Sequence, residues 1–149
     1  MPLNEQIAAD LKDAMRQRDA RRRDVLRFTL AALHNAEIAN RDALDEGAVA
    51  EVLVREAKRR RESIDEFRKA GRQDLVEKEE AELAVLSPYL PTQLSREEIT
   101  EAARQVIQET GASGPKDLGK VMPALMQQFR GRADGRTVSE VVRELLAGS

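Results

Sequence analysis

The sequence predicts an all-α protein, and three features lead to this expectation. Aromatic residues make up only 3% of the chain, with no Trp, so the core has to be built mainly from aliphatic side chains. Charged residues reach 35% and Ala, Leu, Glu and Arg are abundant, a composition typical of helices. Apolar residues also recur at steps of three and four, the period of a helix face. We expect an N-terminal four-helix bundle or pair of hairpins over residues 1–90, then a three-helix module over residues 91–149.

The first helix is expected from Leu3 to Arg18, with Pro2 at its first position, where the N–H that proline lacks would have no helical partner. Asp19 is a favoured N-cap residue and opens a second helix. Because the break between the two helices is very short, they should form an antiparallel hairpin.

A third helix is expected to begin after Asp45, a second candidate N-cap, and to end at Gly71, a good residue for the position after a helix. The fourth helix follows from about Arg72 to Leu86. Residues 87–94 contain two prolines three residues apart, which cannot continue a helix without loss of hydrogen bonds. We place the domain boundary in this linker and expect its apolar residues to lie against the protein.

The C-terminal module is expected to contain three short helices. Ser95 and Glu98 have the spacing of a capping box, so a fifth helix should start there and stop at Gly111. Thr137 and Glu140 have the same spacing and predict the start of the seventh helix.

Between them, one face of a sixth helix carries the apolar residues Leu118, Val121, Met122, Leu125, Met126 and Phe129. Pro123 interrupts this pattern, because its ring would meet the carbonyl of Gly119. We therefore expect either a kink between Gly119 and Pro123 or a helix that begins later than the periodicity indicates.

Several classes of chemistry have no support in the sequence. The chain has no Cys and a single histidine, His34, which argues against a disulfide framework, a thiolate zinc site and a cysteine nucleophile. No serine-nucleophile motif and no phosphate-binding loop of the G-x-x-x-x-G-K-[ST] type is present. We expect no catalytic residue, no metal and no cofactor. Because no long apolar run or charged-then-apolar leader is seen, we expect a cytoplasmic protein without a membrane partner.

Local basic groups are the remaining candidates for a binding site, since the net charge of −2 excludes a basic field over the whole chain. Arginine side chains fork onto phosphate oxygens, and glycines allow close approach of the backbone. The candidate nucleic-acid-binding residues are Lys116, Lys120, Arg130, Gly131, Arg132 and Arg136 in the C-terminal module, and Arg21, Arg22, Arg23 and Arg27 in the N-terminal one.

The alternative for each group is structural. The loop around Arg130–Arg136 is equally explained as a helix–helix turn, with Asp134 as a turn or cap residue. The arginines after Asp19, and the run Lys58–Arg61, lie among acidic residues and are typical of salt-bridged, solvated helix faces.

Taken together, the motifs resemble the YqeY-like proteins of the GatB/YqeY family over nearly the whole chain. The segments that carry the resemblance are Ile7–Met15, Leu33–Glu37, Arg59–Ile64, Ala70–Leu75, Tyr89–Leu94, Asp117–Met122 and Gly131–Gly135. Two departures are His34, where a basic lysine is expected, and Pro123, where a continuous helix is expected.

The resemblance implies a helical bundle joined to a helical module that is similar to the tail of the B subunit of the tRNA-dependent amidotransferase. In that enzyme the tail contacts tRNA, whereas glutamine hydrolysis and phosphoryl activation belong to other domains. We therefore expect a tRNA-binding accessory protein, although the family label is carbon-nitrogen ligase activity with glutamine as amido-N-donor. The alternatives are an adaptor that docks on an aminoacyl-tRNA synthetase or amidotransferase through the apolar face of helix six, and an amidotransferase in its own right.

Overall fold

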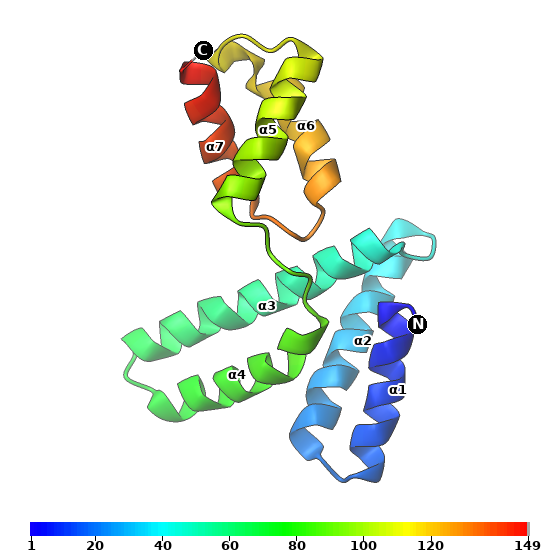
Figure 1. Ribbon diagram of the computed structural model, residues 1–149. Helices are drawn as coiled ribbons and strands as arrows, with labels where there is room; N and C mark the ends of the chain where they lie inside the picture. The colour runs from blue at the N-terminus through cyan, green and yellow to red at the C-terminus, as the bar shows by residue number, and fades with distance from the viewer. Residues whose placement is uncertain (149) are drawn as a thin grey trace. The chain divides into compact units, whose positions relative to one another are not determined.

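The computed structural model describes residues 1–148, and all the regular elements within them are helices (Figure 1). The all-α prediction is therefore confirmed. The chain folds as two compact units, an N-terminal unit of residues Met1–Leu90 and a C-terminal unit of residues Pro91–Ser149. No helix among the described residues is long and apolar enough to span a membrane.

The N-terminal unit consists of two helical hairpins. Its elements are α1 (Leu3–Arg16), α2 (Ala20–Asn40), α3 (Glu46–Lys69), α4 (Gln73–Leu86) and a short 3₁₀ helix η1 (Ser87–Tyr89). Helix α1 packs against α2 and α3 packs against α4, while α2 also contacts both helices of the second hairpin (Figure 1). The shared core is formed by Ile7, Leu26, Leu33, Val49, Val52, Leu53, Ala57 and Leu86.

Local signals set three of the helix boundaries in this unit. Asp19 accepts a hydrogen bond from the backbone N–H of Arg22 at 3.1 Å, and Asp45 accepts one from Ala48 at 2.8 Å, so both predicted N-caps are confirmed. Gly71 follows the end of α3 with φ +70°, a left-handed conformation that glycine adopts without strain.

Two expectations for α1 are wrong by one or two residues. Pro2 is the N-cap and precedes the first helical residue, although its carbonyl still accepts the first helical bond from Gln6. The helix ends at Arg16 because Arg18 has φ +56°, which is incompatible with a right-handed helix. A left-handed residue other than glycine carries a strain of about 1–2 kcal/mol.

The C-terminal unit contains α5 (Arg96–Thr110), a 3₁₀ helix η2 (Pro115–Asp117), α6 (Leu118–Phe129) and α7 (Gly135–Ala147). The three α-helices contact one another pairwise around a single core (Figure 1). The predicted capping box is confirmed, since Ser95 and Glu98 exchange both hydrogen bonds. Gly111 ends α5 with φ +71°. Helix α6 provides Val121, Leu125 and Phe129 to the core.

Pro123 lies inside α6, which begins at Leu118, the residue where the apolar periodicity begins. The expectation of a later start is therefore wrong, and the predicted kink stays a prediction. The capping box at Thr137 is also wrong. Helix α7 begins at Gly135, one turn earlier than that box requires it to, because the side chain of Asp134 accepts a hydrogen bond from the Arg136 N–H at 3.3 Å.

Candidate nucleic-acid interface

The loop that joins α6 to α7, residues 130–134, has a defined backbone. Gly131 has φ +74°, so the position favours glycine, and the N–H of Arg132 donates to the Phe129 carbonyl at 2.6 Å. We call this segment the α6–α7 loop. The loop joins the end of α6 to the start of α7, so the arginines at positions 130, 132 and 136 lie at one end of the unit.

A distant segment fixes the shape of the α6–α7 loop. The N–H of Leu94 donates to the Arg132 carbonyl at 2.8 Å, and the Gln93 amide donates to the Gly131 carbonyl at 2.9 Å. In return, Nε of Arg132 donates to the Thr92 carbonyl at 3.3 Å. Sequence reasoning missed the role of residues 92–94, because bonds across about 40 positions leave no local pattern. The loop is therefore ordered in advance of any ligand.

The three arginines of the loop differ in how much of their charge faces solvent. Arg136 is 87% exposed and lies 3.9 Å from Glu140, and Arg132 is also exposed. Arg130 is half-buried and already engaged in an interaction. Among the three arginines, Arg132 and Arg136 are thus better placed than Arg130 to meet a phosphate group.

Lys116 and Lys120 lie at the opposite end of α6. The helix has 12 residues, which corresponds to about 18 Å, so the structure does not bring these lysines together with the α6–α7 loop. Lys120 is also paired with Asp117, with Nζ 3.4 Å from Oδ1. A hydrogen bond from the Ser113 N–H and the charges of the two lysines lower the pKa of Asp117, so this carboxylate partly neutralises the group.

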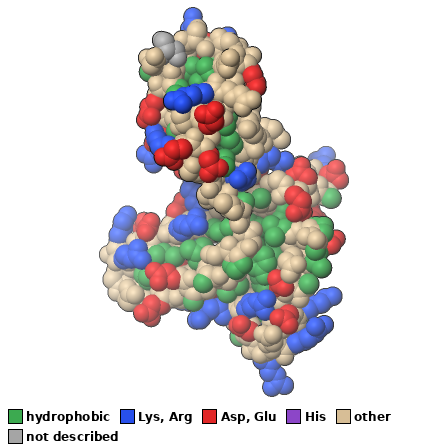
Figure 2. Space-filling model, in the orientation of Figure 1, with side chains coloured by type: hydrophobic (Ala, Val, Ile, Leu, Met, Phe, Trp, Pro, Cys, Tyr) green, Lys and Arg blue, Asp and Glu red, His purple; other side chains and the backbone are tan. Residues whose placement is uncertain are grey.

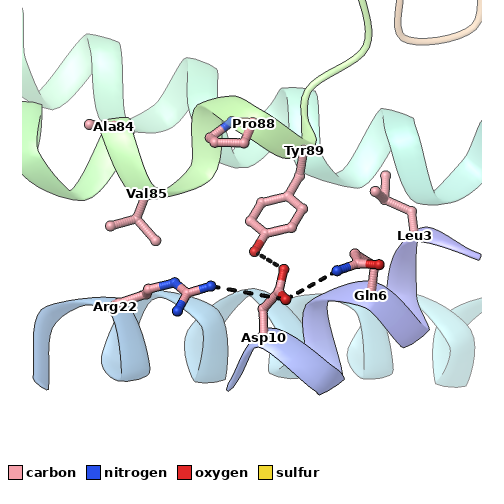
Figure 3. A pocket seen from close by; sticks show the side chains of 8 residues that line it. All are labelled: Leu3, Gln6, Asp10, Arg22, Ala84, Val85, Pro88 and Tyr89. Atoms are coloured by element: carbon pink, nitrogen blue, oxygen red, sulfur yellow. Dashed lines mark hydrogen bonds and ion pairs between the residues drawn. The ribbon is translucent and has the colours of Figure 1, made fainter. Parts of the chain in front are cut away.

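Arg22 of α2 points into a cavity of about 530 Å³ in the N-terminal unit (Figure 3). Its guanidinium donates to Asp13 at 3.1 Å. A second nitrogen lies 4.0 Å from Asp10. The cavity walls are formed by Leu3, Gln6, Asp10, Arg22, Ala84, Val85, Pro88 and Tyr89. The predicted phosphate ligand Arg22 is thus held by two carboxylates of α1.

Asp10 is the centre of the polar contacts in this cavity (Figure 3). It accepts hydrogen bonds from the Tyr89 hydroxyl and from the Gln6 amide, the latter at 3.1 Å. Partial burial, followed by the hydrogen bond to Asp10 and the charge of Asp10, raises the pKa of Tyr89 to about 12. The cluster connects α1 and α2 to η1.

The other predicted arginines of α2 face outward to different degrees. Arg23 donates to Asp24 at 2.8 Å, which lowers the pKa of that carboxyl group. Arg27 is exposed and its charge also acts on Asp24. Arg21 is exposed, and no described residue forms an ion pair or side-chain hydrogen bond with it.

The basic run Lys58–Arg61 is largely structural. Arg60 turns inward and donates to Glu79 at 3.3 Å and to Glu82, with all three side chains at most 19% exposed. Its guanidinium also lies 5.9 Å from the ring centroid of Phe28. These contacts tie α2, α3 and α4 together. His34 is exposed, and the described residues contain no group of three side chains arranged to hold a metal ion.

The described residues thus define an all-helical protein of two units, with exposed cations in the α6–α7 loop and along the helix surfaces. The chain belongs to the Yqey-like protein family, whose profile matches residues 4–146.

Two relatives are fungal proteins named "Altered inheritance of mitochondria protein 41, mitochondrial". The one from Pyrenophora tritici-repentis is 34% identical over 144 residues, which cover 94% of this chain and 78% of the relative. The one from Kluyveromyces lactis is 35% identical over 136 residues, covering 89% of this chain and 69% of the relative. A protein of Schizosaccharomyces pombe named only as uncharacterized is 33% identical over 89 residues, which cover 60% of this chain and 72% of that relative.

Proposed function

We propose that this protein binds tRNA as an accessory factor, with the α6–α7 loop as a principal contact. The observation that carries the proposal is the pairing of two exposed arginines, Arg132 and Arg136, with a loop backbone that residues 92–94 hold in place. A preformed cationic loop loses little conformational freedom when it binds a phosphate backbone. The resemblance of the module to an amidotransferase tail supports the choice of tRNA over other anions.

The electrostatics of the module limit what this contact can be. Its lysines and arginines are matched by an equal number of aspartates and glutamates, so it has no net basic field. Binding therefore depends on a few placed side chains, and its dependence on salt should be shallow. Each phosphate neutralised changes the slope of log K against log salt by about 0.7–0.9.

A filter-binding titration of the full chain with unfractionated tRNA at about 0.05 and 0.2 M salt tests the proposal. We expect the variant Arg132→Gln/Arg136→Gln to bind about ten-fold or more weakly at the lower salt, with a slope smaller by about 1–2. The matched control is Arg104→Gln/Arg143→Gln, which removes two exposed arginines from the same unit away from the loop. Equal losses in both variants, or none in the loop variant, would contradict the proposal.

The structure gives little support to the adaptor hypothesis. It requires an exposed apolar face around Met122, Met126 and Phe129, but Phe129 is buried and both methionines are only partly exposed and pack against the core. For the carbon-nitrogen ligase label, we expect no glutaminase activity from the purified chain alone, which a direct assay can test. A cytoplasmic location stays a prediction, and the names of the two fungal relatives place those proteins in mitochondria.

A further inference from the structure

The end of the α1–α2 hairpin, where the two helices join, carries a second basic surface. Figure 2 shows Lys and Arg side chains gathered over this end of the hairpin. The exposed cations are Lys12, Arg16, Arg18 and Arg21, which we call the corner cations. Lys12 and Arg16 are one helical turn apart on α1, and Arg18 and Arg21 follow within five residues.

Every acidic side chain near this corner is already engaged elsewhere. Asp10 accepts from Tyr89 and Gln6, and Asp13 accepts from Arg22. Asp19 is used as the N-cap of α2, and Asp24 is paired with Arg23. Among the described residues, none forms an ion pair or a side-chain hydrogen bond with any of the four corner cations. Residues 10–24 hold six lysines and arginines against four aspartates, so this end of the hairpin keeps a net positive charge.

The backbone at Arg18 adds a second observation. Its φ of +56° is a conformation that favours glycine, yet the chain has an exposed arginine there. The Arg18 side chain is exposed and forms no ion pair or side-chain hydrogen bond with a described residue. Contacts of this side chain therefore do not explain why an arginine occupies the position. Arg41 has the same conformation at the far end of α2, so the backbone alone does not indicate a site. At Arg18 the left-handed residue coincides with three other exposed cations within ten residues, which is the observation we use.

From these two observations we propose that the corner cations bind the phosphate backbone of RNA. The inference rests on the proposed tRNA binding and gives it a second contact, separate from the α6–α7 loop. It also changes which residues of the N-terminal unit are expected to bind RNA. Arg21 stays a candidate and is joined by Lys12, Arg16 and Arg18. Arg22 and Arg23 are instead paired with carboxylates. Four cations within ten residues can neutralise adjacent phosphates. Contacts to phosphates carry no sequence information, so we expect binding here to be independent of sequence.

The test compares two triple variants of the full chain by fluorescence anisotropy with unfractionated tRNA. The corner variant is Lys12→Gln/Arg16→Gln/Arg21→Gln, and the matched control is Arg55→Gln/Lys58→Gln/Arg61→Gln, which removes the same charge from exposed positions of α3. Glutamine keeps helix propensity in both. We expect the corner variant to bind about ten- to a hundred-fold more weakly at about 0.05 M salt, with a slope smaller by about 2–3, and the control to change less than about three-fold. Equal losses in both triples, or none at the corner, overturn the inference.

A single variant separates loss of binding from loss of folding. Arg18→Gly deletes one corner charge and relieves the left-handed backbone, so it should weaken binding several-fold while Tm stays the same or rises. Arg41 is the other left-handed residue that is not glycine, with φ +58° at the far end of α2. Arg41→Gly should give the same response in Tm without loss of binding. If Arg18→Gly binds as the wild type does, the strained arginine has no role in binding and the inference fails.

Two further probes separate this inference from the proposed function. Single-stranded poly(U) presents the same phosphates without a tRNA fold. If the protein binds poly(U) through the corner cations but does not bind tRNA, the inference is supported and the proposed function is contradicted. Loss of tRNA binding only in the Arg132→Gln/Arg136→Gln variant supports the proposed function and overturns the corner. Binding to vesicles of phosphatidylglycerol and phosphatidylcholine, with no binding to either RNA, assigns the surface to lipid and also overturns the inference.

Discussion

The two units fix their helices and loops with different kinds of polar contact. In the N-terminal unit, half-buried side chains bind one another across helices, as in the cluster around Asp10 and the one around Arg60. In the C-terminal unit, the ion pairs across helices are exposed, as for Arg96 and Glu144 at 2.9 Å. Its loops are held by side chains that bind the backbone, as Gln93 does at Gly131 and Asp117 does at Ser113.

This difference bears on where cations are available for ligands. Charge pairs between helices occupy Arg22 and Arg60, so these arginines of the N-terminal unit serve the fold. The α6–α7 loop is shaped mainly by bonds to its backbone, and the Arg132 guanidinium contributes one N–H to the Thr92 carbonyl. Arg132 and Arg136 both stay exposed. The number of basic residues in a segment is therefore a poor guide to its capacity for binding phosphate.

The largest effect is expected at Arg60. The change Arg60→Ala leaves Glu79 and Glu82, each less than 20% exposed, without the guanidinium that binds both of them. Of the cations on the described residues, only the exposed Lys78, 4.0 Å from Glu82, still pairs with either of them. We expect the N-terminal unit to lose about 3 kcal/mol of its free energy of unfolding. Urea denaturation followed by circular dichroism measures this loss. The control is Arg61→Ala, an exposed neighbour on the same helix, for which a change within about 0.5 kcal/mol is expected. Equal effects at both positions would mean that the cluster adds nothing to stability.

A smaller effect is expected at the start of α7, where two capping signals compete. Asp134→Ala removes the side chain that accepts from the Arg136 N–H, and should lower the free energy of unfolding by about 1 kcal/mol. Thr137→Ala removes the residue that sequence reasoning assigned as the cap, and should change it by less than about 0.5 kcal/mol. The same denaturation experiment compares the two. A larger loss for Thr137→Ala than for Asp134→Ala would mean that Thr137, and not Asp134, caps the helix.

Signals confined to a few residues allowed most helix boundaries to be predicted. Asp19, Asp45 and the Ser95–Glu98 pair act on the backbone within one turn, so their effect can be read from neighbouring residues. The error at α7 has the same local origin, since an aspartate and a threonine stand three residues apart and only the observed backbone decides between them.

Contacts between distant residues could not be predicted. Tyr89 and Asp10 are separated by 79 positions, and Arg60 and Glu82 by 22. Helix packing decides which cation of a basic run turns inward, and the spacing of residues in the sequence does not reveal that packing. For this reason the sequence marked Arg22 as a candidate ligand, and it could not distinguish the engaged Arg22 from the exposed Arg21 beside it.

The most modest effect concerns Tyr89, which can be titrated selectively because the chain has one Tyr and no Trp. Its pKa of about 12 in the folded protein exceeds the value of about 10 in an unfolded chain. The folded state thus holds this proton more tightly, so the contribution of Tyr89 to stability is complete below pH 10 and is lost as the pH rises towards 12.

We expect the ultraviolet absorbance of tyrosinate to appear with a midpoint near 12 in the native chain and near 10 in urea (about 10 for free tyrosine). Asp10→Asn should move the native midpoint downward, because the carboxylate charge and its hydrogen bond both raise the pKa of Tyr89. Asp13→Asn is the control, since Asp13 contacts Arg22 and not the tyrosine. A native midpoint near 10 would mean that the Asp10 cluster is open in solution, and the contrast between the two units would then rest on Arg60 alone.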